Sequence, residues 1–516
     1  MASARGVHQR SSWAHAAGVS CLAAAALACD SEASAPDIPD AGPPPLPQAA
    51  LPLLTCLSPV QTLGECTRDG DCGSGNCVLN ANLSVPDRGP ITLECGAQQG
   101  LGLPRDPCEV RTDCASGLCA MAGNCLQPCT NDADCELGTF CLPVEARLAA
   151  DALAPVMACV RNLAFESDVT VQSGPVAHTS SDRDLVSLDM PATQGTTMLY
   201  FKPDCGSSLE VDSIDVRAGG SVLFSYDDVL DGRTALNPVS NMGPLVPVLI
   251  PNNPQVGAEY ESGVAVGVLT SEATGIVSLV AAREPAGQRI LDLNLFLVGG
   301  GSDEVPGGFR PGDPGVTSFT DRLRELYAGI GIDLGTVRQI DVVGSLREQL
   351  SVLDSNVVHD DQGNAVGLDV PGLDQLFELS IGVDYGGLNL FLVSDMGDLL
   401  GISGGIPGSL GVLGTAASGV AIAVDVVGLD QAPIVALHEM SHQMGLFHTS
   451  EFDGTWIEPL SDTPVCTQTS DQNGDGLLTP AECAGHGADN LMFWSGSGQR
   501  LSDQQRAVLQ RSIVLR

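Results

Sequence analysis

Lysine is almost absent from this chain. Lys202 is the only one, so arginine supplies the other 22 of the 23 basic residues. Against them stand 63 Asp and Glu residues, which give a formal net charge of −40. A surface this acidic repels the phosphates of nucleic acids and the headgroups of anionic lipids. We therefore expect no nucleic-acid partner and no membrane contact made through the folded surface.

Aromatic residues and long apolar runs are scarce as well. Aromatics make up 4% of the chain, whereas glycine contributes 60 of the 516 residues. The apolar run Ala16–Ala28 is only thirteen residues long, which is too short to span a bilayer, and no other run is long enough. The 43% of hydrophobic and 17% of charged residues are typical of a folded protein. The length allows two or three domains, and the glycines favour turns and β structure.

The N-terminus reads as an export signal. Arg5 and Arg10 precede the short apolar run, and small residues end it, so residues 1–28 are expected to be removed as a signal peptide. Two cleavage sites compete. Ala26–Ala28 fits an ordinary A-x-A site, whereas "ALAC" approximates a bacterial lipoprotein box in which Cys29 would be acylated.

Cysteine parity and composition favour the lipoprotein alternative. Once Cys21 leaves with the signal, 17 of the 18 cysteines remain, and acylating Cys29 would leave an even number. Residues 29–55 are rich in proline and alanine and read as a tether. The expected location is the bacterial cell envelope or cell surface, with secretion as the alternative. A lipid on Cys29 would then be the only membrane link, and the mass of the mature N-terminal peptide distinguishes the two.

Cysteines are dense between residues 56 and 160. Three similarly spaced triplets are each followed by one further cysteine, which gives three four-cysteine units too poor in apolar residues to fold without bridges. Close C-x2-C pairs are absent, so the spacing favours disulfides over zinc ligands. The sequence leaves the connectivity within a unit open. The units are Cys66, Cys72, Cys77 and Cys95; Cys108, Cys114, Cys119 and Cys125; Cys129, Cys135, Cys141 and Cys159.

Cys56 and Cys205 remain outside these units. They can pair with each other and join the repeats to the next domain. Alternatively, the segment "KPDCGS" around Cys205 is loosely similar to the cysteine switch by which some metallopeptidase propeptides cap a zinc ion with a thiolate. Both readings stay open. Residues 165–286 alternate apolar and polar positions in short runs broken by Gly, Pro, Asn and Asp, which predicts an antiparallel β-sandwich.

The stretch "HEMSHQMGLFH" places three of the eight histidines within eleven residues. His438 and His442 are four residues apart and share one face of a helix. Gly445 can end that helix in a left-handed conformation, and the turn brings His448 back to the same point. Three imidazoles with an open fourth position are typical of a catalytic Zn²⁺. Glu439 stands where it can take the proton of a zinc-bound water.

This HExxHxxGxxH pattern resembles the signature of the metzincin zinc metallopeptidases. Metzincins also need a methionine turn beneath the zinc, and "ADNLMFW" offers Met492 for that role. Some metzincins place a tyrosine ligand two residues after this methionine. Trp494 stands there in this chain, so no tyrosine ligand is expected.

Residues 287–516 as a whole are most similar to the pappalysin branch of that family. The resemblance rests on "GLFHT" at residues 445–449, Asp462–Pro464, Cys466 and Asn490–Met492. It implies an α/β (α+β) catalytic domain, in which residues 388–394 and 419–426 are the last strands before the active-site helix. Helices are further expected at residues 320–330, 430–445 and 502–515, the last with Ser502 and Gln505 as a capping box.

A second metal site is predicted by "DQNGDGLLTPAE", which fits the twelve-residue Ca²⁺-binding loop at every position. No flanking helices are evident. Cys466 and Cys483 bracket the loop and are expected to pair, so the calcium would be structural. Its ligands would be Asp471, Asn473, Asp475, the carbonyl of Leu477, Thr479 and Glu482.

Together these patterns predict a multidomain, exported zinc endopeptidase that cleaves protein or peptide substrates through metal-activated water and a glutamate base. Two alternatives remain. One is a surface-anchored binding lipoprotein whose repeats and sandwich dock a partner while its peptidase domain is vestigial. The other is a metal-dependent hydrolase of a different bond, which the methionine turn disfavours.

Overall fold

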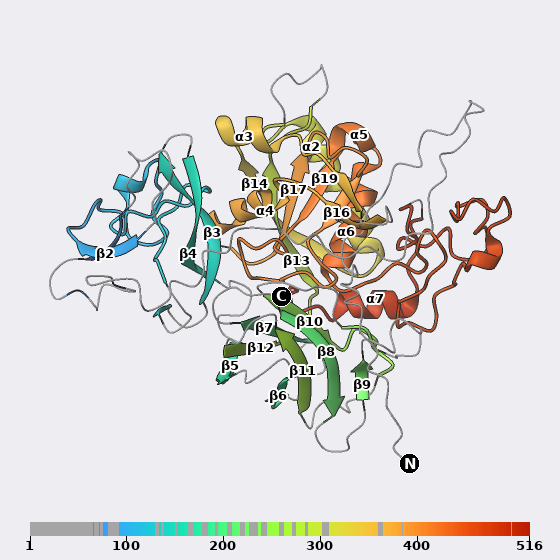
Figure 1. Cartoon of the computed structure of the whole chain (residues 1–516). Coiled ribbons are helices and arrows are strands. Elements are labelled where there is room, and N and C mark those ends of the chain that lie inside the picture. The colour runs from blue at the N-terminus through green and yellow to red at the C-terminus, as the bar shows by residue number, and fades with distance from the viewer. Residues whose placement is uncertain are drawn as a thin grey trace, which may run out of the picture.

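The computed structural model (Figure 1) is multidomain, with several β-sheets and a cysteine-rich N-terminal region. The positions expected for the signal peptide, Cys29, Cys56 and Cys205 lie outside the residues that it describes. Those residues are 66, 72, 76–80, 92–129, 134–135, 139–149, 152–161, 169–177, 184–190, 195–203, 209–216, 222–225, 236–238, 245–256, 263–270, 275–283, 287–301, 309–359, 365–383, 385–496 and 498–516.

The cysteine-rich units are stabilised by disulfides, as the sequence predicts. All three share one connectivity, first cysteine to third and second to fourth, which the sequence alone could not give. The short elements of this region are β1 (Asn76–Asn80), β2 (Thr92–Gly96), a 3-10 turn (Arg111–Asp113), β3 (Thr139–Ala149) and β4 (Ala152–Arg161). The bonds are Cys66–Cys77, Cys72–Cys95, Cys108–Cys119, Cys114–Cys125, Cys129–Cys141 and Cys135–Cys159.

Two four-stranded antiparallel sheets follow, ordered β10-β7-β12-β5 and β6-β11-β8-β9. Alternate side chains on each strand point to opposite faces, so Leu199 and Phe201 enter the core between the sheets while Met198 and Tyr200 leave it on the other side. The strands are β5 (Val169–Ala177), β6 (Asp184–Leu188), β7 (Thr197–Pro203), β8 (Leu209–Val216), β9 (Val222–Ser225), β10 (Val246–Ile250), β11 (Val264–Thr270) and β12 (Gly275–Ala282).

The C-terminal part is an α/β domain around a five-stranded sheet ordered β14-β13-β17-β19-β18. All pairs are parallel except β18 with β19. The two strands expected before the HExxH helix are β17 and β19. The sheet consists of β13 (Ile290–Leu297), β14 (Asp333–Asp341), β17 (Leu388–Val393), β18 (Gly401–Ser403) and β19 (Val420–Ala423).

Each face of this sheet is covered. Leu293, Leu295 and Leu297 pack with the two long helices, whereas Phe296 on the opposite face stacks on Phe391 with ring centroids 4.3 Å apart. The helices and minor elements are α2 (Pro314–Gly329), α3 (Ser345–Leu350), β15 (Asn356–His359), β16 (Ala365–Asp369), α4 (Leu373–Glu378), a 3-10 turn (Leu379–Gly382), α5 (Val424–Val427), α6 (Ala432–Gln443), a 3-10 turn (Gln468–Ser470) and α7 (Asp503–Gln510).

Two of the expected helices have different bounds. The first one starts at Pro314 rather than residue 320, because proline suits the first turn, where its missing N–H costs nothing. The last one has the expected capping box between Ser502 and Gln505, yet it ends at Gln510 instead of residue 515. The remaining residues turn back, and Arg516 exchanges backbone hydrogen bonds with Ile290 at the start of β13.

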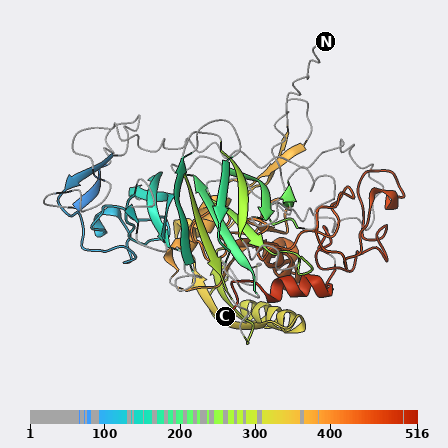
Figure 2. The ribbon, with the colours of Figure 1, turned by 90° about the horizontal axis from the view of Figure 1, so that it is seen from below.

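Seen from below in Figure 2, the sandwich lies against the α/β domain. Its outward face contributes Met198, Tyr200 and Leu249 to the same apolar cluster as Met444 of that domain. The Tyr200 hydroxyl donates a hydrogen bond to the Leu410 carbonyl in the loop between β18 and β19. The cysteine-rich repeats contact both neighbouring domains (Figure 1): Phe140 of β3 packs on Tyr200 of the sandwich with ring centroids 6.3 Å apart, and a β3 amide donates to a carboxylate of α4.

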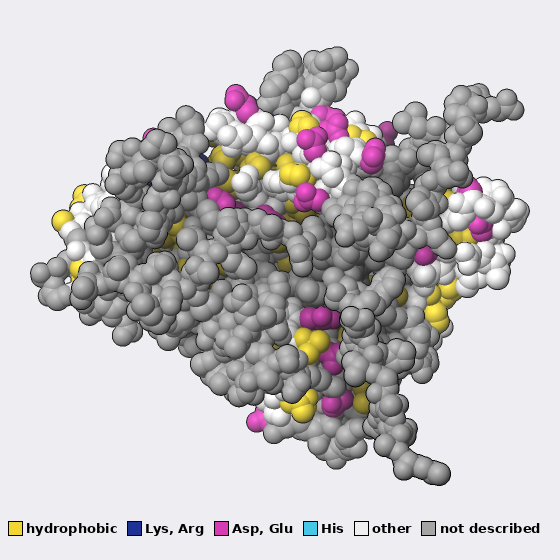
Figure 3. All heavy atoms as spheres, viewed as in Figure 1, with side chains coloured by type: hydrophobic (Ala, Val, Ile, Leu, Met, Phe, Trp, Pro, Cys, Tyr) yellow, Lys and Arg dark blue, Asp and Glu magenta, His cyan; other side chains and the backbone are white. Residues whose placement is uncertain are grey.

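The described part of the face in Figure 3 shows more acidic than basic side chains, in keeping with the composition. Within the described residues, no helix combines the length and the apolar character needed to cross a membrane.

Tyr200→Phe tests the contact between sandwich and α/β domain. It removes the hydroxyl and leaves the buried Leu410 carbonyl without its partner, which should cost about 1–3 kcal/mol and lower the melting midpoint in calorimetry. Tyr327→Phe is the matched control, because the equally buried Tyr327 hydroxyl has no hydrogen-bond partner among the described residues. Equal midpoints for the two variants would show that the Tyr200 bond contributes nothing to the docking.

Candidate metal centre

Helix α6 presents the first two histidines of the HExxH motif. It opens with the apolar segment "APIVAL", carries proline in its first turn, and is buried along its whole length. The helix stops because Gly445 has a φ of 105°, which L side chains rarely adopt. A Cβ on this glycine would also lie 2.4 Å from Leu249 of the sandwich. The chain then reverses, and His448 returns to the face that carries His438 and His442.

The ring nitrogens of these histidines meet at one point. The Nε2 atom of His438 lies 3.0 Å from that of His442 and 3.3 Å from that of His448. Nitrogens bound to one tetrahedral Zn²⁺ at 2.0–2.1 Å would lie about 3.3–3.4 Å from each other. The 3.3 Å distance matches this value and the 3.0 Å distance is a few tenths of an ångström shorter, so the three nitrogens lie close to the positions that a shared zinc ion requires.

Hydrogen bonds at the opposite ring nitrogens fix the tautomers. The Nδ1 atom of His438 lies 2.6 Å from the Leu491 carbonyl, and that of His442 lies 2.5 Å from the Leu446 carbonyl. A carbonyl oxygen only accepts, so both Nδ1 atoms carry the proton and both Nε2 atoms keep a free lone pair. Such partners at the second ring nitrogen orient a metal-binding imidazole and raise its basicity.

His448 is oriented by a carboxylate instead of a carbonyl. Its Nδ1 atom donates to Oε2 of Glu451 over 2.9 Å. This residue was not predicted from the sequence, although its position three residues after the last histidine is a usable signal. The backbone carbonyls of Leu446 and Leu491 leave no such signal, because any residue type can provide a carbonyl.

Burial keeps the helix histidines uncharged. Desolvation, reinforced by His448, lowers the pKa of His438 to about 3. Desolvation and the two neighbouring rings also lower the pKa of His442 well below its usual range. With both helix rings neutral and their protons on Nδ1, no hydrogen lies between the Nε2 atoms of His438 and His442. Their two lone pairs face each other, an arrangement that a cation would stabilise.

Glu439 follows the first histidine and is fully buried. Neither carboxylate oxygen has a hydrogen-bond partner among the described residues. Desolvation raises the pKa of this carboxyl well above its usual range, and the nearby Ser403 backbone offsets the rise only in part. The side chain packs against β18, where a Cβ on Gly401 would lie 2.8 Å from the Glu439 Cγ. An unpartnered carboxylate in such a position calls for a proton or a cation.

The predicted methionine turn adjoins the histidines through a backbone hydrogen bond. Met492 is fully buried, and its neighbour Leu491 supplies the carbonyl that orients His438. The Asn490 side chain accepts the Met492 amide over 2.8 Å, and the Met492 carbonyl accepts the Thr449 amide over 2.9 Å. The turn is therefore bonded both to itself and to the segment that carries His448.

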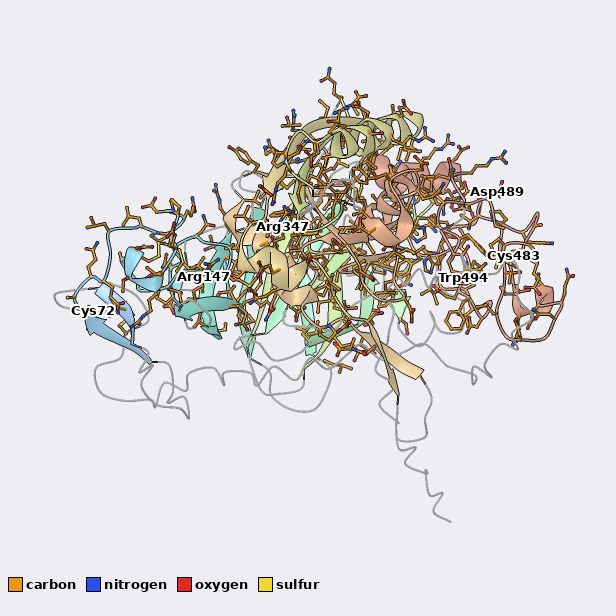
Figure 4. All side chains as sticks on the ribbon, turned by 90° about the horizontal axis from the view of Figure 1, so that it is seen from above. Cys72, Arg147, Arg347, Cys483, Asp489 and Trp494 are labelled. Carbon is orange, nitrogen blue, oxygen red and sulfur yellow. A yellow bond between two sulfur atoms is a disulfide. The ribbon has the colours of Figure 1, made fainter. Side chains whose placement is uncertain are left out.

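Trp494, labelled in Figure 4 near Cys483, packs against the predicted calcium loop. Its indole N–H donates to the Leu478 carbonyl over 2.8 Å, and its ring packs in an apolar cluster with Phe493 and the Cys466–Cys483 disulfide. The indole nitrogen of Trp494 is therefore hydrogen-bonded to the predicted calcium loop and is not available to the histidine centre.

The predicted calcium loop folds its polar side chains onto its own backbone. Asp471 accepts the amides of Gly474 and Gly476, and Asp475 accepts that of Leu477. Hydrogen bonds from Thr479, mainly from its amide, lower the pKa of Glu482, which is therefore ionised at neutral pH.

Further bonds close the same loop. The Asn473 oxygen accepts the Asp475 amide, and Glu482 reaches across to the Gln472 amide at the start of the loop over 3.0 Å. These side-chain oxygens are the hard ligands that Ca²⁺ takes. The Cys466–Cys483 disulfide closes the segment around them.

Three other clusters of potential ligands occur among the described residues, and all of them are cysteine triplets of the N-terminal units. Every cysteine in them is disulfide-bonded, so none offers a thiolate. The histidine triplet is the remaining cluster, with ligand atoms all within 4.8 Å of one another. Comparison with known proteins adds no relative: no family model matches the chain, and no curated protein matches it.

Glu451→Ala tests the outer support of this centre. Loss of the carboxylate that orients His448 should weaken Zn²⁺ binding about 10- to 100-fold while the ligands stay in place. Competition with a fluorescent zinc chelator measures the change. Glu325→Ala, an exposed acidic residue of α2, is the control. Wild-type affinity in both variants would show that Glu451 does not support a metal ligand.

Proposed function

We propose that the chain is an exported zinc endopeptidase of the metzincin type, closest to the pappalysins. The proposal depends above all on one observation: the Nε2 atoms of His438, His442 and His448 converge, and the buried carboxylate of Glu439 follows the first of them on the same helix. This is the donor set of a catalytic zinc site, in which protein ligands leave one position for water. The buried methionine turn and the resemblance in residues 287–516 support a peptidase over another hydrolase.

Bound zinc would supply Lewis-acid polarisation of the scissile carbonyl and lower the pKa of the attacking water to about 7. The chain itself would hold the metal through His438, His442 and His448. Glu439 would accept the proton of the water on a carboxylate oxygen while the water oxygen bonds to the carbonyl carbon. The same carboxyl would then deliver that proton to the amide nitrogen as the C–N bond breaks. One water is consumed, and a carboxylic acid and an amine are formed, between which a proton passes to leave a carboxylate and a protonated amine.

The buried setting of Glu439 suits this double role. Desolvation raises its proton affinity, which favours accepting the proton from water. A vestigial domain would not be expected to keep an unpaired carboxylate at this position, because burying it without function is costly. This observation favours an active peptidase over a binding lipoprotein.

The surrounding segments support a secreted or surface location and a second metal. Seven disulfides among the described residues require an oxidising compartment, as expected for an exported protein. Acylation of Cys29 would tether the enzyme to the cell envelope. The substrate would be a protein or peptide. Ca²⁺ in the loop of residues 471–482 would stabilise the segment between His448 and Met492.

Glu439→Ala should keep the zinc but lose peptide cleavage by several orders of magnitude, because the base is removed while the metal ligands remain. Incubation of the purified protein with a mixed peptide library, followed by mass spectrometry with and without chelator, measures the activity and its specificity. Glu439→Gln, which keeps the shape of the side chain, controls for collapse of the site. Chelator-sensitive cleavage by either variant at the wild-type rate would end the proposed mechanism.

Calcium removal should lower the melting temperature and speed autolysis while zinc remains bound at first, because the acidic side chains of Asp471, Asp475 and Glu482 would then repel one another in one short loop. Glu482→Gln should reproduce the effect by weakening a bidentate ligand. Thermal melts with saturating calcium and with a calcium-selective chelator provide the measurement. Coincident melts would reduce the loop to an acidic turn.

A further inference from the structure

A second buried carboxyl lies away from the histidines. Glu458 is only 3% exposed, although it belongs to a loop rather than to a helix or strand. One of its oxygens contacts the Thr463 hydroxyl, and the other accepts the side-chain amide of Gln505 over 3.2 Å. No cation pairs with it among the described residues. The charge that acts on it is the negative one of Asp462.

A chain of side chains connects this carboxyl to the methionine turn. Gln505 of α7 forms two hydrogen bonds with Asn490, donating to its oxygen over 3.2 Å and accepting from its nitrogen over 2.9 Å. Asn490 in turn accepts the amide of Met492. The Leu491 carbonyl between these two residues accepts the Nδ1–H of His438. Two side chains, those of Gln505 and Asn490, and one peptide group therefore link the loop carboxyl to the first zinc ligand.

The bonding pattern is complete when Glu458 is protonated. A proton on Oε2 can be donated to the Thr463 hydroxyl, whose own hydrogen can point to the Leu460 carbonyl 3.5 Å away. Oε1 then stays free to accept from Gln505. Burial, with a smaller contribution from Asp462, raises the pKa of Glu458 to about 8. The neutral acid is thus the form present at neutral pH.

We propose that Glu458 is a positioning residue of the zinc site, whose neutral carboxyl holds Gln505 and Asn490 and thereby fixes the Leu491 carbonyl behind His438. The inference rests on the proposed function. When Glu458 ionises, an uncompensated charge develops inside the cluster and its bond to Thr463 reverses direction. The cluster then admits water or shifts, and the methionine turn loosens. Alkaline pH would therefore weaken zinc binding at a site whose two helix histidines, His438 and His442, are already neutral.

The raised pKa of Glu458 determines the direction in which stability changes with pH. An acid whose pKa rises from an ordinary 4.5 to about 8 on folding stabilises the folded state below the lower value. That stabilisation is lost as the pH rises through about 8. Histidine protonation weakens zinc binding in the opposite direction, as the pH falls. The two effects therefore occupy different pH ranges and can be separated.

Glu458→Gln tests the inference, because glutamine reproduces the neutral acid: its NH2 can donate to Thr463 and its oxygen can accept from Gln505. Zinc affinity of the full chain is measured by chelator competition at about pH 7 and about pH 9, on either side of the pKa of about 8. Asp489→Asn, which removes an exposed carboxylate of the same segment, is the matched control. Thermal melts of zinc-free samples over the same range report the cluster independently of the metal.

The wild type and Asp489→Asn should bind zinc about 10- to 100-fold more weakly at the higher pH, as loss of an outer support does at other sites. Glu458→Gln should bind as tightly as the wild type at the lower pH and lack this alkaline loss, in its melts as in its affinity. Equal pH profiles for wild type and Glu458→Gln would overturn the positioning role and leave the zinc site standing. A wild type that binds no zinc at either pH would overturn the proposed function and this inference with it.

Discussion

The constraint on which the site depends is the convergence of three imidazole Nε2 atoms in a buried space. The Nε2 atoms of His442 and His448 lie 3.0 and 3.3 Å from that of His438, and each Nδ1 atom donates its proton on the other side of its ring, to a carbonyl or to Glu451. Such an arrangement is unfavourable alone and persists because its supports are rigid: a fully buried helix, a left-handed glycine turn and a bonded methionine turn. The folded chain thus holds the three histidines in the arrangement of a metal-ligand set, and a bound cation would stabilise that arrangement.

The domains around this centre contribute rigidity in different ways. The outer face of the sandwich packs on the end of α6, so the glycine turn before His448 is held by Leu249 as well as by its own backbone. On the far side, the segment between His448 and Met492 has little regular structure and depends on a disulfide, an apolar cluster and buried amide and carboxyl side chains. A metal in the acidic loop would stabilise the same segment. Precision at the histidines thus comes from side-chain bonding as much as from secondary structure.

Much of this organisation could be predicted from the sequence because it follows from local rules. Cysteine spacing predicted disulfide-bonded units, and the Ser502–Gln505 pair predicted a capping box, both of which the structure shows. The spacing of His438, His442, Gly445 and His448 placed the three rings together because helix periodicity and one glycine turn suffice to do so. The connectivity of the disulfides, the partner of His448 and the network around Glu458 depend on contacts between distant residues. No periodicity in the chain encodes those contacts. The predicted end of α7 at residue 515 is wrong for the same reason, because pairing of Arg516 with β13 competes with continuation of the helix beyond Gln510.

X-ray absorption at the zinc edge tests the central claim most directly. It measures the identity and distance of the atoms around the metal in protein purified without chelator. A site formed by His438, His442 and His448 predicts one zinc per chain, with imidazole nitrogens and an oxygen at about 2.0–2.1 Å and no sulfur in the first shell. Zinc surrounded by sulfur at about 2.3 Å, or the absence of zinc, would contradict the assignment of this centre.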